Sequence, residues 1–64
     1  MIKVVFLRDK KGVEVEAKNV SEVFSKLDIL REQYVVIKKG RIICEDEPLS
    51  EEDTIELFTV ASGG

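Results

Sequence analysis

Residues 54–64 run Thr-Ile-Glu-Leu-Phe-Thr-Val-Ala-Ser-Gly-Gly. The first seven residues are rich in β-branched and aromatic types, which predicts a strand over residues 54–60. The two glycines have no side chains and adopt backbone angles closed to other residues, so they can thread a narrow channel. With glycine at roughly 7% of residues, a chance Gly-Gly at two given positions is about 0.5%. We expect a flexible tail over residues 61–64 that presents the Gly64 carboxylate; an ordinary frayed chain end is the alternative.

The residues before this strand predict a second pair of strands. Residues 50–53 are Ser-Glu-Glu-Asp, an acidic turn, and Leu49 is expected to reach the core from the loop before it. Residues 34–38 and 41–44 are two short apolar runs of strand length. Lys39-Gly40 between them predicts a tight turn.

The start of the chain predicts a hairpin. Residues 1–8 are largely aliphatic and β-branched, and residues 9–12, Asp-Lys-Lys-Gly, predict a charged turn. Residues 13–18 then alternate, with apolar side chains on one face and charged ones on the other. The first strand is apolar on both faces over residues 4–7, as is typical of a central strand.

The period changes at Asn19 from two residues to about three and a half, which predicts a helix. Asn19 is a good N-cap, and Glu22 three residues later is expected to reach back to the Asn19 amide. The apolar side chains of this short helix form one stripe: Val20, Val23, Phe24 and Leu27. So short a helix is marginal alone, so the stripe is expected to pack on a sheet.

A hairpin, a helix and three more strands in 64 residues predict one small α+β domain over residues 1–60. We expect a mixed sheet of about five strands with one covering helix. The last strand is expected to pair beside the first, which would leave the tail free at a sheet edge. That arrangement is the β-grasp, or ubiquitin-like, fold.

The composition argues against several functions. The chain has no histidine and one cysteine, which excludes a His-based triad, a Cys-His pair and a cluster of thiolate or imidazole metal ligands. The formal charge is -3, and no aromatic platform lies among the basic residues, so direct nucleic-acid binding is not expected. No run is long enough to span a membrane, and a lone cysteine in so small a domain favours the cytoplasm. We expect a monomer that is not an enzyme and binds no metal or cofactor.

The whole chain resembles the small ubiquitin-like sulfur carriers in length and element order. This group includes the thiamine-pathway carrier, the small molybdopterin synthase subunit, and the archaeal and bacterial modifiers used in tRNA thiolation. The most specific likeness is residues 50–64, an acidic turn that leads into a final strand and a terminal Gly-Gly. Residues 35–43, Val-Val-Ile-Lys-Lys-Gly-Arg-Ile-Ile, also resemble the third and fourth strands of these carriers.

This resemblance implies a mechanism at the tail. An E1-like enzyme that uses ATP would adenylate the Gly64 carboxylate, and sulfur from a persulfide enzyme would displace AMP and leave a thiocarboxylate. Gly63 and Ser62 would lie in the cleft of the activating enzyme, and a downstream acceptor enzyme would take the sulfur. Ser62, and Glu-Glu-Asp-Thr at residues 51–54, are closer to the tRNA-thiolation carriers, so 2-thiouridine synthesis is the preferred outcome. Thiamine or molybdopterin synthesis, and conjugation of Gly64 to lysines, are the alternatives.

Phe58 and Val60 are predicted to dock the partner. If Ile55 and Leu57 face the helix, Phe58 and Val60 face away from it, and an exposed apolar patch usually marks an interface. The expected neighbours of Phe58 are Val5, Leu7, Val36 and Ile43, opposite an assumed core of Ile2, Val4, Phe6, Val35, Ile37 and Ile42. The alternative is that Phe58 belongs to the core.

Two other features have bland explanations. Cys44 could relay sulfur, but a lone cysteine at a strand end is more often a small apolar filler. The acidic residues at 45–47 and 51–53 do not have the spacing of a calcium loop, so a solvated face is the preferred interpretation. Such a face could steer a basic activating partner.

Overall fold

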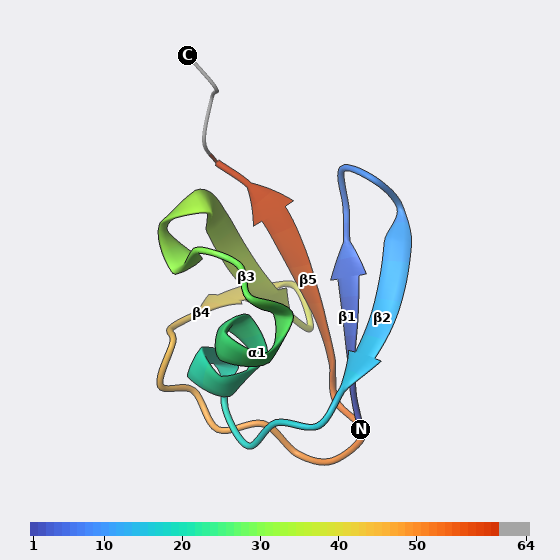
Figure 1. Ribbon diagram of the computed structural model, residues 1–64, viewed down its shortest axis with the longest axis vertical. Coiled ribbons are helices and arrows are strands. Elements are labelled where there is room, and N and C mark those ends of the chain that lie inside the picture. The colour runs from blue at the N-terminus through green and yellow to red at the C-terminus, as the bar shows by residue number, and fades with distance from the viewer. Residues whose placement is uncertain (61–64) are drawn as a thin grey trace.

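A five-stranded mixed sheet packs against one helix in the computed structural model, which describes residues 1–60 (Figure 1). The elements are β1 Ile2–Phe6, β2 Lys11–Val15, α1 Val20–Leu27, the short 3-10 helix η1 Arg31–Gln33, β3 Tyr34–Lys38, β4 Arg41–Ile43 and β5 Thr54–Thr59. This confirms the predicted α+β class and the β-grasp arrangement.

The last strand lies at the centre of the sheet. The strand order is β2-β1-β5-β3-β4, with β5 parallel to β1 and antiparallel to β3. Pairing of the last strand beside the first is confirmed. The expectation of an exit at a sheet edge is wrong, because β3 is apolar on both faces and covers the other side of β5. The chain therefore leaves from a strand that is hydrogen-bonded on both sides.

The first hairpin turns earlier than the sequence predicts. Phe6 pairs with Lys11 and Val5 with Gly12, so Lys11 and Gly12 belong to β2 and not to the turn. Lys10 supplies the left-handed backbone conformation, with φ of 55°. The glycine was therefore not needed at the turn itself.

The second hairpin follows its prediction. Lys39 and Gly40 both have positive φ, 54° and 78°, which is the backbone of a two-residue turn whose twist matches that of the strands. Such a turn places Lys38 opposite Arg41 and Ile37 opposite Ile42. Glycine at the second position removes the steric penalty of this conformation.

The helix begins at the predicted cap. The Asn19 side chain accepts a hydrogen bond from the Glu22 N–H at 2.9 Å. Glu22 does reach back, but its carboxylate accepts from the Lys18 N–H at 2.8 Å and not from the Asn19 amide. The cap is therefore reciprocal as predicted, but the Glu22 side chain bonds to the backbone N–H one residue earlier than expected.

The loop after β4 closes over the first turn of α1. The N–H groups of Val20 and Ser21 donate to the carbonyls of Glu47 and Glu45, at 3.3 and 2.9 Å. These are helix N–H groups that have no partner within the helix. Leu49 is half-buried and packs against the core from this loop, which confirms its predicted role.

The core lies between α1 and one face of the sheet. Its buried side chains are Ile2, Val4, Val15, Val20, Val23, Phe24, Val36, Ile55 and Leu57. The predicted facing of β1 and β5 is thus confirmed.

The predicted facing of β3 and β4 is wrong. Val36 is buried and Ile43 packs against the core, whereas Val35 and Ile37 alternate to the opposite face and Ile42 is 76% exposed. The cause is that residues 35–37 and 42–43 are apolar at every position, so alternation does not mark the inner face.

The acidic turn before β5 is fastened by Asp53. Its carboxylate accepts from the Ser50 N–H at 2.8 Å and lies 3.1 Å from the Lys38 ammonium. The Ser50 hydrogen bond, and after it Lys38, lower the pKa of Asp53. The turn thereby ties the start of β5 to the end of β3.

We expect Asp53→Asn to destabilise the protein by about 1 kcal/mol at pH 7, because a partly exposed charge-assisted contact is lost. A carboxyl whose folded-state pKa is depressed stabilises above its unfolded value, near 4, and this stabilisation fades as pH falls through the folded-state value. Urea unfolding of both proteins at pH 7 and pH 2.5 measures the gap between their free energies of unfolding. The gap should narrow at pH 2.5, and Glu52→Gln in the same turn should leave stability unchanged at both pH values. A gap equal at the two pH values would contradict the charge assignment.

Candidate functional site

The described chain ends at an anchored residue. The Val60 N–H donates to the Gln33 carbonyl at 3.0 Å, and Thr59 pairs with Tyr34 in the sheet. The backbone is therefore held in place by β3 and η1 as far as Val60. The predicted tail residues Ser62, Gly63 and Gly64 lie outside the described residues.

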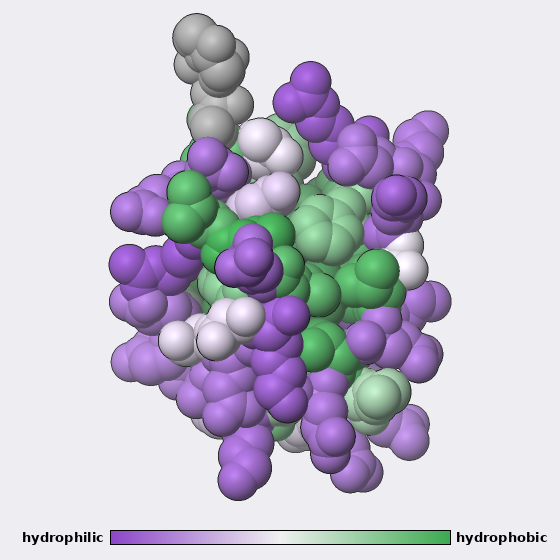
Figure 2. Space-filling view, viewed as in Figure 1, coloured by the Kyte–Doolittle hydropathy of each residue, from purple (hydrophilic) through white to green (hydrophobic). Residues whose placement is uncertain are grey.

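Aromatic side chains support this anchor from the helix side. The Tyr34 ring meets Phe6 edge-on, with centroids 5.9 Å apart, and stacks on Phe24 at 6.3 Å with 27° between the planes. These rings join β1, α1 and β3 beneath the end of β5. Figure 2 shows hydrophobic surface between α1 and the β1–β2 hairpin, because α1 has only 8 residues and leaves part of the sheet uncovered.

The sheet face opposite α1, here called the open face, carries Phe58. This side chain is 52% exposed, so the alternative that it belongs to the core is excluded. Val35 lies directly opposite it on β3. Alternation along the strands places the other apolar residues of the face: Val5, Leu7, Ile37 and Ile42.

The predicted neighbours of Phe58 are therefore half correct. Val5 and Leu7 share its face, but Val36 lies in the core and Ile43 packs against it. Val35, Ile37 and Ile42 replace them because the facing of β3 and β4 is reversed. Val60 is 47% exposed and lies between this patch and the tail. No element within residues 1–60 covers the open face (Figure 1).

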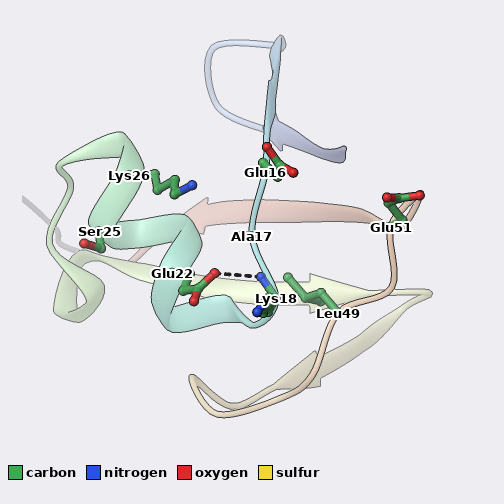
Figure 3. Close-up of a pocket in the computed structure, with 8 residues that line it drawn as sticks. All are labelled: Glu16, Ala17, Lys18, Glu22, Ser25, Lys26, Leu49 and Glu51. Atoms are coloured by element: carbon green, nitrogen blue, oxygen red, sulfur yellow. Dashed lines mark hydrogen bonds between the residues drawn. The ribbon is translucent and has the colours of Figure 1, made fainter.

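A hollow of about 680 Å³ lies away from this region (Figure 3). It is bounded by α1, the connection from β2 to α1 and the loop before β5, and its lining includes Glu16, Glu22, Lys26 and Leu49. Glu22 already accepts the Lys18 N–H there. The hollow lies where β5 begins, at the opposite end of the strand from the tail. It is a gap between packed elements and is separate from the open face.

Cys44 is an exposed free thiol that directly follows β4. The acidic residues after it are engaged through their backbone: Glu45 and Glu47 supply carbonyls to α1. Glu45 also forms an ion pair with Arg31. Within residues 1–60 no group of three or more His, Cys, Asp or Glu side chains is arranged to hold a metal ion.

Two residues of this region, Gln33 and Glu56, were not predicted from the sequence. Gln33 anchors Val60 through its carbonyl, which any residue could supply, so no side chain marks it. Glu56 lies on the open face between Val5 and Ile37. Its charge, between Ile55 and Leu57 in the predicted strand, was the available signal.

A β-grasp domain with an exposed apolar sheet face beside an anchored last strand defines a protein of the ubiquitin-like class. A family model described as the ThiS family matches residues 4–64. The chain belongs to the ThiS family, whose members are small sulfur carriers and not catalysts. Members work with an E1-like activating enzyme and sulfur-transfer partners. A comparison with curated proteins found no match. No helix within residues 1–60 is long and apolar enough to cross a membrane.

Proposed function

We propose that Gly64 is the sulfur-carrying residue of this protein. Its carboxylate attacks the α-phosphate of ATP in an E1-like enzyme and releases pyrophosphate, which gives an acyl-adenylate. The terminal sulfur of a persulfide then attacks the acyl carbon and displaces AMP. A thiol then attacks the donor's sulfur in the resulting acyl disulfide, which releases the thiocarboxylate and joins the thiol and the donor in a disulfide. The protein is a cosubstrate that binds no cofactor of its own, and ATP belongs to its partner.

The observation that supports this proposal is the placement of Phe58 and Val60. Both are about half exposed, at 52% and 47%, and both lie at the end of β5 from which the tail continues. An exposed apolar patch of this kind marks a protein interface. A partner bound there holds a rigid central strand, and the tail enters its active site from a defined point.

The direct test is intact mass spectrometry after incubation with the E1-like enzyme and persulfide donor of the same organism, with ATP. Replacement of one carboxylate oxygen by sulfur adds about 16 Da, and omission of ATP should prevent the change. A mass that stays constant with every component present would overturn the proposal.

Phe58→Ala is expected to raise the KM of the activating enzyme for this protein by about tenfold to a hundredfold, as for a central aromatic contact of an interface. The turnover number should change little, because the tail chemistry is intact. ATP–pyrophosphate exchange measures both values. Val13→Ala, at an exposed apolar residue on the helix side of β2, is the matched control. Equal KM values for the two variants would contradict docking through Phe58.

The preferred acceptor is tRNA, with 2-thiouridine as the product. The support is sequence alone: Ser62 before the glycines and Glu-Glu-Asp-Thr at residues 51–54. Family membership fits thiamine and molybdopterin synthesis equally well. Deletion of the gene distinguishes them, since loss of tRNA 2-thiouridine without a thiamine or molybdenum-cofactor requirement supports the tRNA assignment. We propose that the carrier acts in the cytoplasm and as a monomer.

Conjugation to protein lysines is the second candidate, because it uses the same Gly64 adenylate and differs only in the nucleophile. A search for modified lysines tests it. Trypsin is unsuited, since the last basic residue of the chain is Arg41. A protease that cleaves after glutamate would leave residues 57–64 on the lysine, because Glu56 is the last glutamate. Such remnants in cell extracts would establish a modifier role.

A further inference from the structure

Glu56 is a carboxylate within the apolar open face. It is half-buried in β5, and its neighbours across the two flanking strands are Val5 and Ile37. Ile42 lies beyond Ile37 on the same face. Phe58 is two residues along the strand and therefore on the same side. The charge thus has apolar neighbours on both flanking strands and toward Phe58, while Thr54 and Lys3 follow on the same face toward the start of β5.

Within residues 1–60 Glu56 has no ionic partner. The ion pairs of this part of the chain are Arg31 with Glu45 and Lys38 with Asp53. The described side-chain hydrogen bonds use the side chains of Asn19, Glu22 and Asp53. Water is therefore what solvates the Glu56 carboxylate when the open face is free.

A protein that covers Phe58 and Ile37 must also cover Glu56 and remove this water. Burial of an unpaired carboxylate is strongly unfavourable, whereas one matched by a hydrogen-bonded cation is tolerated. A guanidinium suits the site best, because its planar fork donates to both carboxylate oxygens. An apolar partner surface without such a group would be rejected.

We propose that Glu56 selects the partner of the open face by requiring an arginine, or less effectively a lysine, set among apolar side chains on that partner. The inference rests on the proposed function, since the partner is the E1-like activating enzyme.

The test compares wild type, Glu56→Gln and Glu56→Arg in ATP–pyrophosphate exchange and in calorimetric binding to the activating enzyme without ATP. Loss of a buried charge pair should weaken binding by about tenfold or more for Glu56→Gln and about a hundredfold for Glu56→Arg, with the turnover number unchanged. Wild-type affinity should fall with added NaCl, and Glu56→Gln should lose most of that dependence.

Glu14→Gln is the matched control, because Glu14 lies on the same sheet face at the outer strand β2, opposite Lys3. It should bind like wild type, and circular dichroism should show every variant folded. If wild type and Glu56→Gln bind equally, the inference is overturned while the proposed function stands. If wild type itself is neither bound nor adenylated, the proposed function is overturned and the inference with it.

Discussion

Removal of Gly63 and Gly64 is expected to abolish thiocarboxylate formation. The deletion withdraws the reacting carboxylate by two residues, or about 7 Å when extended, and places the Ser62 side chain where the activating cleft would hold a glycine. Displacement of a reacting group by even about 1 Å can cost a hundredfold in rate. Intact mass spectrometry after incubation with the activating enzyme, ATP and persulfide donor measures the outcome. We expect no detectable gain of about 16 Da.

The control for this deletion is folding. The core and the strands of the described part of the chain lie within residues 2–59, so the shortened protein should unfold at the same urea concentration as wild type. Gly64→Ala separates length from bulk, because it restores the chain length but adds a methyl group at the reacting residue. A truncated protein that still gains sulfur would contradict the assignment of Gly64.

Leu57→Ala is expected to lower the free energy of unfolding by about 2–5 kcal/mol, the usual cost of truncating a fully buried leucine. Leu57 is 1% exposed and lies in the central strand beside Phe6 and Val36. A domain this small has little stability in reserve, so much of the variant should be unfolded at 37 °C. Urea unfolding followed by circular dichroism measures the loss.

The neighbouring residue supplies the matched comparison for Leu57. Phe58→Ala removes a larger side chain, yet we expect it to cost about 1 kcal/mol or less, because half of that side chain is already exposed. The two substitutions should therefore separate stability from docking: one unfolds the domain, and the other weakens only its interaction. A greater loss of stability for Phe58→Ala would mean that the open face is part of the folding core.

Local chemistry made most of the fold predictable. The change of period at Asn19, the turn at Lys39-Gly40 and the two-residue period of side-chain direction along β5 each have a physical cause that acts within a few residues. Fold class, strand pairing beside β1 and exposure of Phe58 followed from them. The position of the first turn was not predictable in this way, because Lys10 adopts a positive φ and the sequence favours Gly12 for that conformation.

The site was harder to predict where the sequence is uniformly apolar. In residues 35–37 either face could turn inward, and the choice is made by distant contacts: Tyr34 stacks on Phe24 and Val36 pairs with Leu57. Those contacts fix Val35 and Ile37 on the open face. Glu56 was visible as a charge in a strand, but its apolar neighbours depend on which strands flank β5.

The hydrogen bond between Val60 and Gln33 limits the distance from β5 at which the chemistry proposed at Gly64 can occur. Residues 61–64 separate this hydrogen bond from the carboxylate proposed to react, and four residues span at most about 14 Å. An activating enzyme that grips the open face must therefore hold the α-phosphate of ATP within that radius of the end of β5. The length of the tail thus limits the distance between the partner's docking surface and the partner's active site.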